Sequence, residues 1–129
     1  MPDIGGEQIN RPPPQAADSD RAEGLELVVA DDGASTRVLA VGELDMGTAP
    51  GLAEVLDGLL DAGVRQIELD LSRLTFVSAA GLGVFCTATA RSRQAGGRLR
   101  LTGVTPRTRR ILRITGLDGV LDMQPPGTQ

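Results

Sequence analysis

Residues 66–102, with the sequence QIELDLSRLTFVSAAGLGVFCTATARSRQAGGRLRLT, decide the fold of this chain. Gln66 to Leu71 alternates apolar with polar residues, which predicts a β-strand, and Arg98 to Thr102 repeats the pattern. Between them, Ala79 to Gln94 has the period of a helix, which Gly96-Gly97 should end. The predicted apolar stripe of this helix consists of Leu82, Phe85, Cys86 and Thr89. A strand, a helix and a second strand in this order indicate an α/β fold.

Upstream of this region the sequence predicts a hairpin and a helix. Leu25 to Val29 and Arg37 to Val41 form two strands, which pair in antiparallel fashion through a turn at Asp31-Asp32-Gly33. The helix begins after Thr48 as its N-cap and ends at Gly63. Its apolar stripe consists of Leu52, Val55, Leu56, Leu59 and Leu60. The strand that follows this helix needs a crossover connection, so it should run parallel to the second strand of the hairpin.

Downstream, the sequence predicts a third helix and a short last strand. Thr105-Pro106 opens the helix and Gly116 ends it. Its apolar residues are Ile111, Leu112 and Ile114. Val120 and Leu121 belong to the short last strand. The predicted order of elements is β-β-α-β-α-β-α-β, for which we expect a mixed sheet with helices mainly on one face.

The two ends of the chain differ in composition from its middle. Residues 1–23 are rich in Pro, Gly, Gln and Asp, and they predict a disordered N-terminal tail. Residues 124–129 (QPPGTQ) predict a disordered C-terminal tail for the same reason. Residues 24–123 are then one folded domain, in keeping with a length of 129 residues.

The composition excludes most classes of enzyme. The chain contains no histidine, tryptophan or tyrosine, only two phenylalanines (Phe76 and Phe85) and one cysteine, Cys86. Without histidine, Ser-His-Asp and Cys-His catalysis cannot operate, and a zinc site lacks its usual ligands. We therefore expect no enzymatic activity, no metal and no cofactor.

Three features of the sequence predict a cytoplasmic protein. The N-terminus lacks the basic and apolar regions of a secretory signal. No apolar run reaches the ~18 residues that a bilayer span requires. A single cysteine fits a reducing compartment.

Charge is distributed unevenly along the chain. The net charge is −4, but residues 1–70 carry 15 acidic and 4 basic residues, whereas residues 71–129 carry 2 acidic and 9 basic ones. All 13 basic residues are arginine, and four of them lie on the third predicted helix: Arg107, Arg109, Arg110 and Arg113. These four form either a solvated face or a site for an acidic partner. A pI near 4.7 argues against direct nucleic-acid binding.

Three segments together resemble a known family. They are Val41 to Leu52 (VGELDMGTAPGL), Leu69 to Val84 (LDLSRLTFVSAAGLGV) and Ile111 to Asp122 (ILRITGLDGVLD). In this order and spacing they are similar to the STAS domain of bacterial anti-sigma factor antagonists, and the resemblance covers residues 25–123.

The resemblance implies a switch protein that binds another protein and touches neither nucleic acid nor membrane. The expected partner is an anti-sigma factor that is also a serine kinase with a histidine-kinase-like ATPase fold. An antagonist that captures this partner frees a sigma factor for transcription. In the family, phosphorylation of a serine at the start of the second helix blocks capture, and a phosphatase restores it.

The chain departs from the family pattern at the phosphorylated position. The pattern is Asp-Ser-Ser-Gly-Leu or Asp-Ser-Thr-Gly-Leu, whereas this chain has Ser78-Ala79-Ala80-Gly81-Leu82. Ala80 occupies the acceptor position and has no oxygen that could take a phosphate. The remaining hydroxyl, on Ser78, is either the N-cap of the helix or, less in keeping with its position, a second acceptor.

The resemblance also suggests which residues contact the partner. They are Asp45, Ser78, Ala79, Ala80, Gly81 and Leu82. The alternative for Asp45 is to brace the first helix.

An alternative for the whole protein is a scaffold subunit of a larger signalling assembly, in which the domain associates weakly with its own kind. A third hypothesis is a small-ligand module, because a helix N-terminus can bind an anion.

Overall fold

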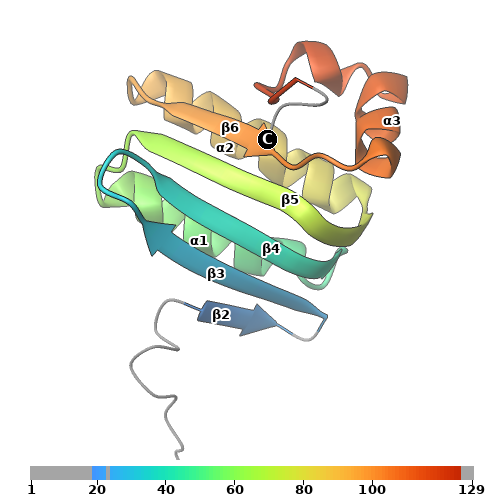
Figure 1. Ribbon diagram of the computed structural model, residues 1–129, viewed down its shortest axis with the longest axis horizontal. Coiled ribbons are helices and arrows are strands. Elements are labelled where there is room, and N and C mark those ends of the chain that lie inside the picture. The colour runs from blue at the N-terminus through green and yellow to red at the C-terminus, as the bar shows by residue number, and fades with distance from the viewer. Residues whose placement is uncertain (1–18, 23, 126–129) are drawn as a thin grey trace, which may run out of the picture.

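The computed structural model describes residues 19–22 and 24–125, which form a five-stranded sheet and three α-helices (Figure 1). The strands of this part of the chain are β2 (Ser19–Ala22), β3 (Leu25–Asp31), β4 (Thr36–Leu44), β5 (Gln66–Val77) and β6 (Arg98–Thr102). They lie side by side in the same order as in the sequence. The pairs β2–β3 and β3–β4 are antiparallel, and the pairs β4–β5 and β5–β6 are parallel.

Two helices connect the parallel strands and cover the same face of the sheet. They are α1 (Ala49–Asp61), between β4 and β5, and α2 (Ala79–Gln94), between β5 and β6. Figure 1 shows both behind the sheet, whereas α3 (Pro106–Ile114) follows β6 at the sheet edge. Because crossovers between parallel strands share one hand, consecutive ones in the same direction put their helices on one side. The predicted mixed sheet with helices mainly on one face is confirmed.

The core lies between the sheet and these two helices. From α1, the leucines spaced four residues apart point inward: Leu52, Leu56 and Leu60. From α2, the buried residues are Gly81, Phe85, Ala88, Thr89 and Ser92. Leu82 and Cys86, predicted on the buried stripe, are half-buried beside the core instead. The helix is rotated toward its small residues because these let it approach the sheet closely.

Strand β5 is longer than its sequence pattern suggests. The alternation predicts an end at Leu71, but the strand continues to Val77. Its inward residues are Ile67, Leu69, Leu71, Leu74 and Val77, so the spacing changes from two residues to three. The register with β4 shifts at two places, as expected for β-bulges, which add a residue to one strand. At the first shift, Asp70 accepts a hydrogen bond from the backbone N–H of Ser72 over 2.9 Å.

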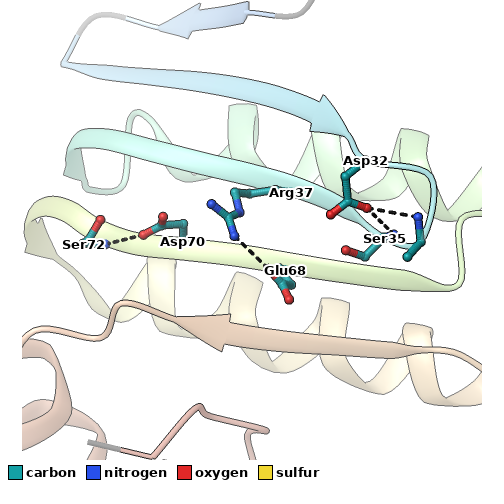
Figure 2. A network of polar contacts seen from close by, with 7 residues as sticks. Asp32, Ser35, Arg37, Glu68, Asp70 and Ser72 are labelled. Carbon is teal, nitrogen blue, oxygen red and sulfur yellow. Dashed lines mark hydrogen bonds and ion pairs between the residues drawn. The ribbon is translucent and has the colours of Figure 1, made fainter. Parts of the chain in front are cut away.

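A network of polar side chains lies on the sheet face that points away from α1 and α2 and at the hairpin beside it (Figure 2). Arg37 of β4 pairs with Glu68 of β5 over 3.3 Å on this face. At the hairpin between β3 and β4, the carboxylate of Asp32 accepts hydrogen bonds from the N–H groups of Ala34 and Ser35 over 3.0 and 2.8 Å. These bonds lower the pKa of the Asp32 carboxyl. They confirm the turn that the acidic residues before Gly33 predict.

The N-terminal boundary of the fold differs from the prediction. Residues 19–22 form β2 and pair with β3, so the expectation of a disordered tail over residues 1–23 is wrong for these four residues. The register pairs Ser19 with Val28 and Ala22 with Leu25. Backbone hydrogen bonds to a neighbouring strand order this segment despite its weak apolar pattern. The rest of the predicted tail, residues 1–18 and 23, lies outside the described residues.

The C-terminal end of the fold also differs from the sequence prediction. Val120 and Leu121 do not form the predicted last strand, since they follow a short 3₁₀ helix, η2 (Leu117–Gly119). A single parallel bridge joins Met123 to Leu101 of β6. On α3, Ile114 is exposed although the sequence predicts it on the apolar stripe, because the helix packs inward through Thr108 and Leu112.

The last described residues are attached to β6. The N–H of Gln124, which the sequence assigns to a disordered tail, donates to the carbonyl oxygen of Leu101 over 2.9 Å. Asp122 pairs with Arg98, whose hydrogen bond lowers the pKa of the Asp122 carboxyl. The ordered part of the chain therefore extends past residue 123. Residues 126–129 of the predicted tail lie outside the described residues.

Candidate functional site

The ends of β4 and β5 meet beside the start of α2. The register pairs Leu44, the last residue of β4, with Val77, the last residue of β5. The backbone N–H of Ser78 donates to the carbonyl oxygen of Leu44 over 2.9 Å and ties the two strand ends together. The turn after β4 and the first turn of α2 therefore share one end of the fold. Binding sites in α/β proteins commonly lie at the carboxyl ends of parallel strands.

Ser78 is the N-cap of α2, as the sequence predicts. Its backbone is extended, with φ −99° and ψ 173°, and its Oγ accepts a hydrogen bond from the N–H of Gly81 over 3.3 Å. The side chain of an N-cap serine satisfies one of the unpaired N–H groups of the first turn. The hydroxyl of Ser78 is thus engaged within the helix.

Removing this cap should lower stability slightly. We expect Ser78→Ala to reduce the free energy of unfolding by about 0.5 to 1 kcal/mol, at the lower end of capping effects because the bond is long. Urea denaturation measures the change. Ser78→Asp serves as the control, because a carboxylate can also cap and should retain the stability. Equal stability of Ser78→Ala and the unmodified chain would show that Oγ does not cap.

Gly81 sets the distance between α2 and the strand ends. A Cβ at this position would lie 2.6 Å from Cδ2 of Leu44 and 3.1 Å from Cγ2 of Val77. Leu44 itself is fully buried, so it has little room to move away. Gly81 is also buried and Leu82 is half-buried against the core. These two predicted contact residues position the helix, and their accessible surface is small.

Ala79 and Ala80 are the exposed residues of the first turn of α2. No acidic residue lies in this turn. The N-terminus of a helix carries a partial positive charge and N–H groups without intrahelical acceptors. Because methyl groups cover little of this turn, the backbone stays accessible to an acidic or polar group of another protein.

Asp45 braces the turn between β4 and α1. Its Oδ1 accepts hydrogen bonds from the N–H groups of Gly47 and Thr48, each over 2.9 Å. Oγ1 of Thr48 accepts from the N–H of Asp45 over 2.9 Å and donates to the carbonyl oxygen of Glu43 over 2.8 Å. Thr48 therefore occupies the N-cap position without capping α1 through its side chain. The sequence leaves two roles open for Asp45, partner contact and bracing of the first helix. Its hydrogen bonds are those of a residue that braces the helix start.

Two exposed apolar side chains at this end were missed by sequence reasoning. Met46 follows β4 by two residues and is 78% exposed, and Phe76, next to the end of β5, is 48% exposed. Phe76 is exposed because the second register shift of β5 turns both Thr75 and Phe76 outward. The broken alternation in LTFV is the signal that could have indicated this. We call Met46, Phe76, Ala79 and Ala80 the α2 face.

A groove of about 270 Å³ between α1 and α2 begins at the α2 face. Ala80, Gly83 and Val84 line it from α2, and Ala53 and Leu56 line it from α1. Most of its walls are apolar, but Asp57 of α1 and Thr87 of α2 also line it, so the groove extends the apolar character of the α2 face only in part.

The described part of the chain gives no indication of a metal or membrane site. Within residues 19–22 and 24–125, no group of three or more His, Cys, Asp or Glu side chains is arranged to bind a metal ion. In the same ranges, no helix combines the length and the apolar character that crossing a bilayer requires.

Comparison with known sequences shows the family. A family model described as "Mlab, STAS domain" matches residues 27–124. An anti-sigma-B factor antagonist of Staphylococcus aureus (strain NCTC 8325 / PS 47) is 35% identical over 80 residues, which cover 62% of this chain and 74% of that protein. An anti-sigma-B factor antagonist of Staphylococcus epidermidis is 31% identical over 97 residues, which cover 75% of this chain and 88% of that protein.

Solved structures agree with this result. The crystal structure of an anti-sigma factor antagonist from Mycobacterium paratuberculosis matches with a TM-score of 0.72 and 25% identity, covering 83% of this chain and 91% of that one. The Bacillus cell fate determinant SpoIIAA in the phosphorylated form shares the fold, with a TM-score of 0.62, 19% identity and coverages of 78% and 92%. These names describe antagonists and regulators rather than enzymes, in agreement with the sequence. The three motifs, the family model and the fold together show that the chain belongs to the STAS domain family.

Proposed function

We propose that this chain is an anti-sigma factor antagonist that captures its partner through the α2 face and thereby frees a sigma factor for transcription. The observation that carries the proposal is the exposed, uncharged first turn of α2, at the end of the sheet where β4 and β5 end and where Met46 and Phe76 are exposed. Large apolar side chains exposed next to accessible backbone N–H groups suit a protein partner better than a small ligand. The names of the Staphylococcus relatives support the choice of partner.

The partner is an anti-sigma factor that is also a serine kinase with a histidine-kinase-like ATPase fold. The sequence resemblance implies this class of partner. An acidic or polar group of the partner approaches the start of α2, where the helix dipole favours negative charge. Apolar side chains of the partner pack against Met46 and Phe76 and reach toward the groove.

Capture in this protein is not switched off by phosphorylation at residue 80. The side chain there is a methyl group, and the neighbouring hydroxyl of Ser78 is engaged as the helix cap. In a family member with a serine at this position, phosphate adds roughly −1.5 to −2 charges to the interface. Because Ala80 cannot acquire this charge, the antagonist stays competent while the kinase is active.

An Ala80→Ser variant tests both parts of the proposal. Capture from the cytosol of the source organism, with the full chain as bait, identifies the anti-sigma factor by mass spectrometry. We expect the purified partner to bind the unmodified chain equally well before and after incubation with Mg-ATP. Ala80→Ser should gain one phosphate under the same conditions and lose affinity, because the new charge lies in the interface. Calorimetry measures the affinity. Mass spectrometry of the intact protein measures the modification.

Two results would contradict the proposal. If the unmodified chain were phosphorylated and lost affinity, another hydroxyl would act as the switch, and Ser78→Ala would identify it. If capture recovered only this protein or other STAS proteins, the chain would be a scaffold subunit instead, and sedimentation would show a stable oligomer.

A further inference from the structure

Helix α3 carries a line of exposed arginines that is separate from the α2 face. Arg107, Arg110 and Arg113 are spaced three residues apart and are all exposed. Ile114 lies on the same side of the helix and is 72% exposed. The buried residues, Thr108 and Leu112, are on the opposite side. We call Arg107, Arg110, Arg113 and Ile114 the arginine stripe.

Within residues 19–22 and 24–125, no carboxylate forms an ion pair with the arginines of this stripe. Elsewhere in the described ranges, Arg37, Arg91 and Arg98 each form an ion pair with a carboxylate. Arg107 reaches only the carbonyl oxygen of Thr75, at 3.5 Å, and no contact is recorded for the guanidinium groups of Arg110 and Arg113. Like charges three residues apart on a helix repel each other. The stripe therefore does not stabilise the isolated fold.

The apolar part of the stripe points to a protein ligand. Ile114 leaves apolar surface among the arginines, and Val120, which follows η2, is 48% exposed. Arginine is enriched in protein interfaces because its planar group can bind carboxylates in bidentate fashion while its stem packs on apolar atoms. No aromatic side chain lies on α3 to stack with bases, and the net charge of the chain is −4. These features favour an acidic polypeptide over nucleic acid.

We propose that the arginine stripe binds an acidic protein segment whose carboxylates pair with Arg110 and Arg113 and whose apolar side chain covers Ile114. Charge complementarity selects this ligand, since the only charges on the exposed side of α3 are positive. The contact between Arg107 and Thr75, the residue before Phe76, brings one end of the stripe close to the α2 face. The two surfaces can thus act together, but the stripe binds its ligand on its own.

A short synthetic peptide of glutamate and leucine is the probe, titrated into the full ¹⁵N-labelled chain. We expect saturable shifts of the backbone amides between residues 106 and 120, and an affinity that falls several-fold from about 50 to about 200 mM NaCl. Arg110→Gln/Arg113→Gln should weaken binding about tenfold, because two rim charge pairs are lost. Arg65→Gln/Arg73→Gln, at two exposed arginines whose guanidinium groups form no hydrogen bond or ion pair in the described part of the chain, is the matched control and should bind like the unmodified chain.

Several outcomes would overturn the proposal. They are the absence of saturable binding, shifts centred outside α3 and η2, or equal affinity of the double variant at unchanged helix content. Tighter binding of a DNA duplex than of the peptide would assign the stripe to nucleic acid. Self-association abolished by the double variant would assign it to a second copy of this chain.

Discussion

Ala80→Glu is expected to abolish capture of the anti-sigma factor without harming the fold. Residue 80 is exposed, lies in the first turn of α2 and lines the entrance of the groove. A fixed negative charge there repels acidic groups of the partner and replaces a methyl group in a packed interface. Like charges facing each other across an interface cost several kcal/mol, so affinity should fall by about 100-fold or more.

The fold should tolerate this charge or gain from it. An acidic side chain near a helix N-terminus interacts favourably with the helix dipole, by about 0.3 to 1 kcal/mol. Thermal denaturation of Ala80→Glu should therefore match or exceed that of the unmodified chain. A loss of binding at retained stability can then be assigned to the interface.

Ala90→Glu is the matched control for this experiment. Ala90 is also an exposed alanine of α2, but it lies ten residues further along the helix. The same change of charge there should leave the affinity for the anti-sigma factor unchanged. Equal loss in both variants would mean that net charge, and not the α2 face, governs binding. Full affinity of Ala80→Glu would place the interface elsewhere on the protein.

Gly42→Ala is expected to cause the largest loss of stability. Gly42 of β4 has φ +120°, a conformation that residues with a Cβ rarely adopt. A Cβ there would lie 2.2 Å from the carbonyl oxygen of Gly24. This contact is with backbone, which also accepts a hydrogen bond from the N–H of Glu43 over 2.7 Å. Backbone strain and overpacking together should lower the free energy of unfolding by about 2 to 4 kcal/mol.

Gly33→Ala separates the two causes of this loss. Gly33 also has a positive φ, +91°, but a Cβ there would meet no atom within 4 Å. The substitution should therefore cost only the strain of the left-handed conformation, about 1 to 2 kcal/mol. Chemical denaturation of both variants measures the difference. If Gly42→Ala were no less stable than Gly33→Ala, the close approach to Gly24 would not constrain the fold.

Much of the fold follows from the order of apolar residues along the chain. The leucines of α1 and the alternating residues of β3, β4 and β6 have the periods of a helix and of strands that bury one face. Local spacing specifies such elements because each one buries its apolar side independently of its neighbours. The motifs likewise indicate the family, and they reveal alanine at the phosphorylated position without any structure.

The composition of the α2 face could not be predicted in the same way. Phe76 is exposed because β5 acquires extra residues where it pairs with β4, and register between strands is a property of two segments. Met46 lies outside the strands, in the turn after β4. From the sequence, Asp45 could either contact a partner or brace the first helix. The hydrogen bonds that it accepts from Gly47 and Thr48 are those of a bracing residue.

The sequence by itself determined the element order, the family and the absence of a phosphate acceptor at Ala80, since each depends only on residue type or on the spacing of nearby residues. The tertiary structure decided which residues reach the surface at the end of the sheet. It did so through contacts between distant segments, such as Gly81 against Leu44 and β2 against β3. Periodicity carries no information on such contacts, because their energies depend on how two surfaces fit together.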